Sequence, residues 1–150
     1  MAKYCRYYYR VPFSETDAMG IVHHSNHPRY LERGRVEFLR EVGFPYTEIM
    51  KQGIHIPLTD LSVSYKKPLQ FDEILVVETS ISDVTRVRLN FKYRIFSAPE
   101  LLPTSLADEP LEGSPSVLGE TFHCAVNDQG RPVPMNATLL QTLQNLKGSP

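Results

Sequence analysis

The sequence predicts an α+β domain in which an antiparallel sheet of about five strands wraps one long central helix. Three observations lead to this class: a strand-like segment near the amino end, an amphipathic helix after it, and a series of segments in which apolar and polar residues alternate. With 150 residues, 41% of them hydrophobic, the chain is long enough to bury a core without disulfides or metal ions. We therefore expect residues 1–150 to form a single domain.

The first strand is expected at residues 7–13, where every second residue is apolar or aromatic. This alternation predicts one buried face, made of Tyr7, Tyr9, Val11 and Phe13. Residues 14–20 are typical of a turn, and Gly20 at its end can adopt backbone angles closed to other residues.

The long helix is expected to follow this turn. Ser25 or Asn26 is the predicted amino-terminal cap, Pro28 suits the first turn, and Gly43 ends the helix. The residues that recur at helical spacing on its inner face are Leu31, Gly34, Arg35, Phe38 and Val42. The glycine in this stripe predicts that another element packs close to the helix.

The rest of the chain changes to period two after a short helical stretch near residues 47–52. Strands are predicted at residues 56–65, 74–81, 87–96 and 117–126. Between them, residues 97–115 contain four prolines and four carboxylates, which indicates a mobile surface insertion between two paired strands. A last helix is expected to begin at Asn136 and to end at Gly148.

Composition and charge exclude several classes of function. Sixteen basic and seventeen acidic residues leave no broad charge for nucleic acid or anionic lipid. The amino end has no apolar stretch typical of a signal peptide, and no later segment has transmembrane length. Cys5 and Cys124 are too far apart to form a metal-binding motif. We expect a cytoplasmic protein that has no cofactor, no metal and no membrane insertion.

Two segments carry a specific resemblance. Residues 10–37 read RVPFSETDAMGIVHHSNHPRYLERGRVE, and residues 64–72 read SYKKPLQFD. Their order and spacing resemble the 4-hydroxybenzoyl-CoA thioesterase and YbgC-like family of hotdog proteins. The resemblance extends through residues 4–96 and, more loosely, through residues 117–145. One departure is Phe13, where several YbgC-like members have a tyrosine, so no role for a hydroxyl group carries over to it.

The resemblance implies hydrolysis of an acyl-CoA to a free acid and CoA. Asp17 would be the nucleophile or the general base, and the backbone N–H of His24 at the helix start would stabilise the oxyanion. That choice is physically sensible, because the first N–H groups of a helix lack intrahelical partners and lie at its positive end. Gly20 would let the turn bring the backbone close to the thioester.

Further residues are expected to contact the substrate. The candidates are Val22, His23, Asn26, Tyr30, Lys66, Arg86 and Arg88. The cations, with Lys67, are candidates for the CoA phosphates, although an ordinary polar strand face explains them equally well. The resemblance also implies a homodimer, often paired again to a tetramer, with the pocket across the dimer interface. The thioester of an acyl-carrier protein is an alternative substrate.

Other interpretations of the same residues stay open. His23 and His27 suggest a metal site, but the sequence offers few further ligands and Pro28 interrupts regular helix there. Glu32 on the helix is a reserve candidate for the catalytic base. The whole domain is alternatively a hotdog dehydratase or hydratase of 3-hydroxyacyl thioesters, or a non-catalytic module that binds acyl thioesters.

Overall fold

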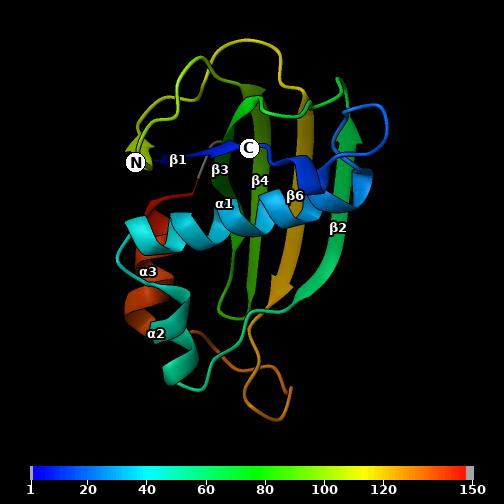
Figure 1. The fold of residues 1–150 in the computed structure, drawn as a ribbon. Helices are drawn as coiled ribbons and strands as arrows, with labels where there is room; N and C mark the ends of the chain where they lie inside the picture. Colours follow the sequence, from blue (N-terminus) through cyan, green and yellow to red (C-terminus); the bar gives the residue numbers. More distant parts are fainter. Residues whose placement is uncertain (1, 148–150) are drawn as a thin grey trace.

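The computed structural model, which describes residues 2–147, contains one antiparallel sheet of six strands (Figure 1). The strands are β1 (Tyr4–Arg10), β2 (Leu58–Tyr65), β3 (Ile74–Val84), β4 (Arg88–Ser97), β5 (Ser105–Ala107) and β6 (Val117–Cys124). Their order across the sheet is β2-β6-β4-β3-β1-β5, so β2 and β5 form the two edges. The four main predicted strands after the helix are all present, within a few residues of their expected ends.

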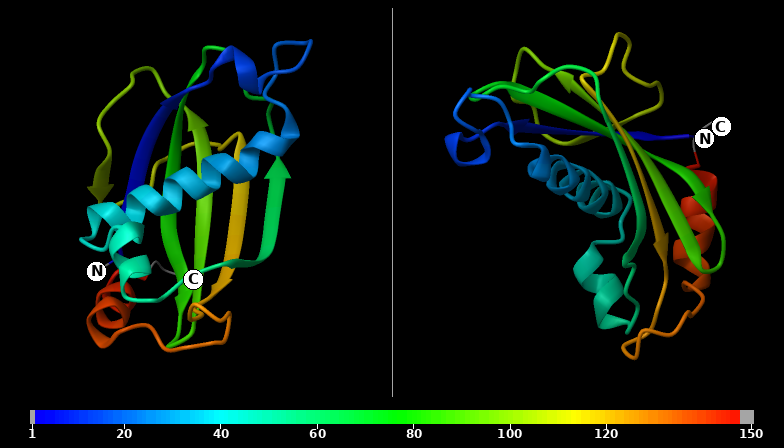
Figure 2. Two further views of the ribbon diagram at one scale, coloured as in Figure 1. Left: turned by 60° about the horizontal axis from the view of Figure 1, so that its bottom comes forward. Right: turned by 90° about the vertical axis from the view of Figure 1, so that its right-hand side faces the viewer.

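One long helix, α1 (His27–Glu41), lies across the concave face of this sheet, which curves around it (Figures 1 and 2). Two short helices flank the fold, α2 (Tyr46–Lys51) after α1 and α3 (Ala137–Asn145), which packs against β3 near the carboxyl end. The inner face of α1 buries Tyr30, Leu31, Gly34 and Phe38. This arrangement confirms the predicted α+β class with a single central helix.

The close packing predicted at Gly34 is present. A Cβ atom at this position would lie 2.5 Å from Thr79 Oγ1 and 2.9 Å from Val77 Cγ1, both on β3. Contacts this short do not occur between real side chains, so only glycine fits where α1 crosses the sheet.

The prediction for the first strand is wrong at its end. β1 stops at Arg10, and Phe13 is 74% exposed instead of buried. The physical reason is Pro12, which has no N–H to donate to a strand ladder. Residues Phe13–Glu15 form a 3₁₀ turn, closed by the Thr16 N–H to Phe13 O at 3.1 Å. The side-chain alternation of a strand therefore does not continue to Phe13.

The predicted insertion at residues 97–115 does separate two paired strands, β4 and β6, but it is more than an excursion. It contains β5, which pairs with β1 and raises the strand count from about five to six. The buried Glu78 also accepts the Leu111 N–H at 2.5 Å and the Arg94 Nε–H at 2.8 Å. The segment is therefore fastened to the outer face of the sheet.

The last helix begins as predicted. Asn136 is its cap, because the side-chain oxygen accepts the Leu139 N–H at 2.7 Å, and Leu139 and Leu143 are fully buried. Gly148, its predicted end, lies outside the described residues. Within residues 2–147, no helix is long and apolar enough to cross a membrane.

Candidate active site

Asp17 lies on the tip of a short hairpin that leads from β1 to α1. The Asp17 N–H donates to Ile21 O at 2.9 Å, Gly20 N–H donates back to Asp17 O at 3.0 Å, and Thr16 pairs with Val22. Gly20 has a φ of 74°, a left-handed conformation that favours glycine. The predicted need for Gly20 in this turn is thus confirmed, although its contact with a substrate stays a prediction.

The two oxygens of the Asp17 carboxylate have different surroundings. Oδ1 accepts the N–H of Met19 at 2.8 Å and that of Ile21 at 3.4 Å, which fixes the side chain over its own turn. Oδ2 has no hydrogen-bond partner among residues 2–147, and the residue is exposed. One oxygen is held in place while the other remains free to act on a ligand.

The start of the helix presents a free donor seven residues after Asp17. His24 begins the 3₁₀ turn His24–Asn26 that precedes α1, so its N–H has no intrahelical acceptor. Within the described part of the chain no other acceptor lies within hydrogen-bond distance of that N–H. The group therefore satisfies the requirement for an oxyanion donor.

Asn26 is the N-cap residue of α1, as predicted, but without the side-chain hydrogen bond of a cap. Neither Ser25 nor Asn26 caps it with a side chain; instead His23 Nδ1 accepts the Ser25 N–H at 3.3 Å. Asn26 is buried, and its amide donates to Glu15 O at 3.0 Å. Asn26 therefore joins the hairpin to the helix, and its amide is turned away from any ligand.

A cavity of about 290 Å³ opens beside His24. Its walls include Val22, Tyr65, Lys66 and the exposed Lys67. The Tyr65 hydroxyl donates to His24 O at 3.3 Å, which keeps the end of β2 close to the helix start. Two of the predicted substrate contacts, Val22 and Lys66, are thus beside the candidate donor. Asp17 does not line this cavity within a single protomer.

The structure does not bring Tyr30, Arg86 or Arg88 to this cavity. Tyr30 is only 1% exposed, and its hydroxyl donates to Glu15 Oε1 at 2.6 Å, so it has no surface for a substrate. Arg86 and Arg88 lie at the β3–β4 hairpin, at the opposite end of the sheet (Figure 1). Tyr65 beside the cavity pairs with Val117 of β6, which pairs with Ile95 of β4. Along β4, seven residues separate Arg88 from Ile95, which is about 23 Å at the usual rise of a strand.

Glu15 is a functional candidate that the sequence analysis missed. Its carboxylate accepts two tyrosine hydroxyls, from Tyr9 at 2.9 Å and from Tyr30 at 2.6 Å. Burial, and then the hydrogen bond to Glu15, raise the pKa of both tyrosines above the ordinary value, so both stay protonated donors at neutral pH. Only the alternation that turns Tyr9 inward hinted at this arrangement.

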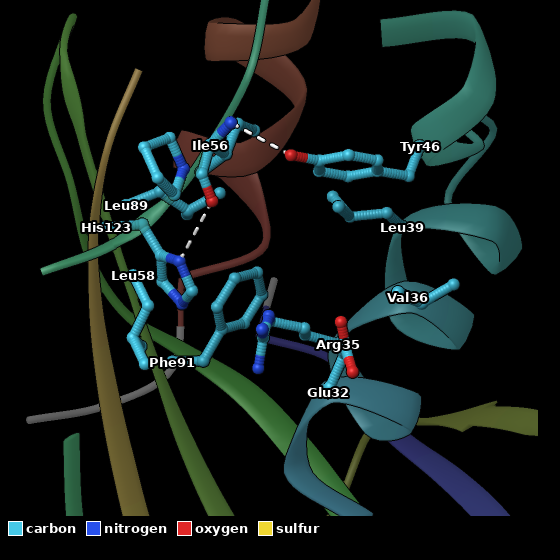
Figure 3. Close-up of a pocket in the computed structure, with 11 residues that line it drawn as sticks. Glu32, Arg35, Val36, Leu39, Tyr46, Ile56, Leu58, Leu89, Phe91 and His123 are labelled. Carbon is cyan, nitrogen blue, oxygen red and sulfur yellow. Dashed lines mark hydrogen bonds between the residues drawn. The ribbon is translucent and has the colours of Figure 1, made fainter. Parts of the chain in front are cut away.

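A second cavity, of about 280 Å³, lies beneath the middle of α1 (Figure 3). Most of its lining is apolar, but Glu32, Arg35 and His123 also border it. Glu32, the reserve candidate for the base, thus faces this second cavity and not the one beside His24. The structure gives it no role in a site with Asp17.

A buried polar chain closes one side of this second cavity. Ile56 O accepts from His123 Nδ1 at 3.1 Å, and Thr121 Oγ1 lies 2.9 Å from His123 Nε2 and 2.6 Å from the Tyr93 hydroxyl. Burial, with the positive charge of Arg35, lowers the pKa of His123 to about 4. The neutral ring must therefore accept from Thr121, which in turn accepts from Tyr93. This chain is satisfied without any ligand.

The histidines near the helix start do not form a metal site. His27 is buried, its Nδ1 lies 3.2 Å from His24 O, and burial lowers its pKa below the ordinary value. In the described part of the chain, no three side chains of His, Cys, Asp or Glu come close enough to hold an ion.

Comparisons with known proteins identify the family and the fold. A model of the thioesterase-like superfamily matches residues 11–143. The acyl-CoA thioester hydrolase YbgC of Escherichia coli O157:H7 is 31% identical over 93 residues, which are 62% of this chain and 69% of YbgC. The match to this chain covers 68% of the length of a relative in Aquifex aeolicus and 63% of the length of a relative in Bacillus subtilis.

Two solved structures resemble the whole fold. A hypothetical protein of Aquifex aeolicus is 36% identical, with a TM-score of 0.78 over 92% of this chain and 98% of that chain. The DHNA-CoA thioesterase of Staphylococcus aureus is 28% identical, with a TM-score of 0.78 over 95% and 93% of the two chains. The chain therefore belongs to the thioesterase-like superfamily, and its sheet around one helix is the predicted hotdog-type fold.

Proposed function

We propose that this chain is an acyl-CoA thioesterase in which Asp17 carries the reaction and the His24 N–H stabilises the oxyanion. The observation that supports this most is a carboxylate with one fixed and one free oxygen on a hairpin that is followed directly by the unsatisfied N–H at the helix start. The names of relatives, an acyl-CoA thioester hydrolase and a DHNA-CoA thioesterase, support the same reaction class.

The chemistry needs only these two groups and water. In the general-base route, Asp17 Oδ2 takes a proton from water, and the hydroxide adds to the thioester carbonyl. The oxyanion accepts the His24 N–H, then collapses and breaks the C–S bond, and the CoA thiolate takes the proton from Asp17. In the nucleophilic route, Oδ2 itself attacks the carbonyl and releases the thiolate, and water then hydrolyses the mixed anhydride.

Lys66 and Lys67 suit the anionic end of the substrate. Both are exposed, both line the cavity beside His24, and neither has a carboxylate partner among residues 2–147. Ammonium groups in such positions bind phosphates as point charges. We propose that they hold the CoA phosphates in place of the distant Arg86 and Arg88.

A second copy of the chain would complete the site. β2 is an edge strand that pairs with β6 on one side only, and Leu58, Leu61 and Tyr65 on it are 46%, 41% and 51% exposed. Exposed apolar edges of this length are normally covered in stable proteins. Pairing of β2 with β2 of a second protomer would cover this edge. The edge ends at the cavity beside His24, which Asp17 of the same protomer does not line. The tetramer, the carrier-protein substrate and the cytoplasmic location stay predictions.

The test is free-thiol release from a panel of CoA esters with short, medium and long aliphatic, benzoyl and hydroxybenzoyl groups. Wild type should release thiol from at least one ester, and Asp17→Asn should lose most turnover while keeping its fold. Asp83→Asn is the matched control, because Asp83 is an aspartate on β3 whose carboxylate bonds Lys147. An Asp17→Asn variant with unimpaired turnover would refute the assignment.

The dehydratase alternative has less support. Such a reaction needs a histidine that faces a carboxylate, and within residues 2–147 the one ion pair of that kind is His55 with Asp128. His55 precedes the start of β2, whereas the candidate site lies at the end of β2. Addition of water to an enoyl-CoA without thiol release would favour this alternative, and binding of CoA esters without any turnover would favour the non-catalytic module.

A further inference from the structure

Glu15 accepts four hydrogen bonds, two at its side chain and two at its backbone oxygen. The carboxylate accepts the hydroxyls of Tyr9 on β1 and Tyr30 on α1. The backbone oxygen accepts the His23 N–H at 2.9 Å and the Asn26 side-chain amide at 3.0 Å. One residue therefore connects the end of β1, the hairpin of Asp17 and the start of the helix.

The surroundings of the carboxylate are built to hold it in one position. Tyr30 is 1% exposed and lies at a ring distance of 5.4 Å from Tyr9, so neither hydroxyl can move freely. The Arg33 guanidinium lies 4.6 Å over the Tyr9 ring and adds positive charge nearby. Hydrogen bonds to an ionised acceptor are stronger than those between neutral groups.

Glu15 is only two residues from Asp17, and Thr16 between them is fixed by hydrogen bonds from its N–H and its hydroxyl to Phe13 O. Within the described residues, the Glu15 carboxylate makes no hydrogen bond besides those to Tyr9 and Tyr30. The hydrogen bonds that Glu15 accepts instead connect the segment before Asp17 to His23 and Asn26, the residues on either side of the His24–Ser25 pair.

We propose that Glu15, held by Tyr9 and Tyr30, is a positioning residue that sets the geometry between Asp17 and the His24 N–H. This inference rests on the proposed function, since it assigns a role within the same site. Glu15 does not touch the thioester, and it acts through the turn of Asp17. Misplacement of a catalytic group by about 1 Å costs on the order of 100-fold in rate, so loss of the anchor should lower kcat and leave KM nearly unchanged.

The variants separate the hydrogen bonds from the charge. Glu15→Ala removes both acceptors and should lower kcat by about 10- to 100-fold. Glu15→Gln keeps one acceptor and presents an amide donor to the second tyrosine, whose hydroxyl can accept, so its kcat should lie between those of Glu15→Ala and wild type. The double variant Tyr9→Phe/Tyr30→Phe should resemble Glu15→Ala.

Two control variants match these changes. Tyr8→Phe alters the neighbouring tyrosine of β1, which points to the other face and whose hydroxyl makes no hydrogen bond within residues 2–147. Glu41→Gln neutralises an exposed carboxylate at the far end of α1. Both should keep wild-type kcat and KM.

The experiment measures kcat and KM on the ester that wild type hydrolyses best, with the unfolding midpoint and the amide hydrogen exchange of each variant. A fall in kcat at near-constant KM, with faster exchange at the Met19 and His23 amides and a fully folded protein, supports the inference. Wild-type kcat in folded Glu15→Ala overturns it, and so does a loss of rate that only follows the unfolded fraction. Unaltered exchange at those two amides likewise overturns it.

The same measurements distinguish this inference from the proposed function. If Asp17→Asn is inactive but Glu15→Ala is unimpaired, the positioning role alone is wrong. If Asp17→Asn retains full turnover, the catalytic assignment is wrong. In that case, and also if no ester is hydrolysed, amide exchange at Met19 and His23 still decides whether Glu15 fixes the turn.

Discussion

Replacing Gly34 with alanine adds a methyl group where β3 leaves no room for it. The new Cβ would lie 2.5 Å from Thr79 Oγ1 and 2.9 Å from Val77 Cγ1. Nonbonded carbon atoms attract each other at about 3.5–4.0 Å, so both contacts are strongly repulsive. Both neighbours are fully buried, so either the helix or the strand must shift.

The magnitude follows from two opposing effects. Overpacking a tight core costs about 1–3 kcal/mol, and two simultaneous contacts place this site toward the upper end. Alanine gains about 1 kcal/mol over glycine in helix propensity. The net expectation is a loss of about 2 kcal/mol in the free energy of unfolding.

Urea unfolding of Gly34→Ala, Thr79→Ala and the double variant measures this effect. Thr79 Oγ1 has no hydrogen-bond partner among the described residues, so Thr79→Ala removes the nearer contact without breaking a hydrogen bond. Gly34→Ala should therefore cost less in the Thr79→Ala background than in wild type. A Gly34→Ala variant as stable as wild type, or an equal loss in both backgrounds, would refute this account of the packing.

Three further predictions concern buried groups. The pKa of His123 is lowered to about 4 by burial, whereas the unfolded chain binds the proton near the ordinary 6.5. The folded state should therefore lose up to about 3 kcal/mol as pH falls from 6.5 to 4, and urea midpoints of His123→Gln should lack that dependence. Glu78→Gln leaves Arg94 without its carboxylate and should cost up to about 3 kcal/mol, with faster amide exchange in residues 97–115. Burial raises the pKa of Cys5 to about 12, so a thiol reagent at neutral pH should modify Cys124 first, and equal rates would contradict this.

The elements that apolar periodicity marks could be predicted from the sequence. β4 and β6 alternate buried and less buried residues over most of their length, β3 is a mainly apolar segment with five consecutive buried residues, and α1 buries a stripe that includes Gly34. Local patterns of this kind depend on the nearest residues alone. They are therefore present in the sequence before any tertiary contact is known.

The features that were missed depend on tertiary contacts. β5 is only three residues long and exists because β1 presents an edge to it, and the polar residues around it carry no period. Alternation also reveals which face of β4 Arg88 occupies but not which end of the sheet it occupies. The prediction therefore assigned Arg86 and Arg88 to the substrate site, although the two residues lie at the opposite end of the sheet from that site.

Glu15 and Asp17 show how far such reasoning extends. Two carboxylates separated by one threonine look equivalent in the sequence, and both are typical of a solvated turn. The 3₁₀ turn Phe13–Glu15 directs the first toward Tyr9 and Tyr30, and the hairpin directs the second outward, where backbone N–H groups hold only one of its oxygens. Two tyrosine hydroxyls occupy the Glu15 carboxylate, which suits the proposed anchoring role, whereas Asp17 keeps one oxygen without a hydrogen-bond partner, which suits the proposed catalytic role. Neighbouring acids thus acquire separate roles from their hydrogen-bond partners, which only the folded chain supplies.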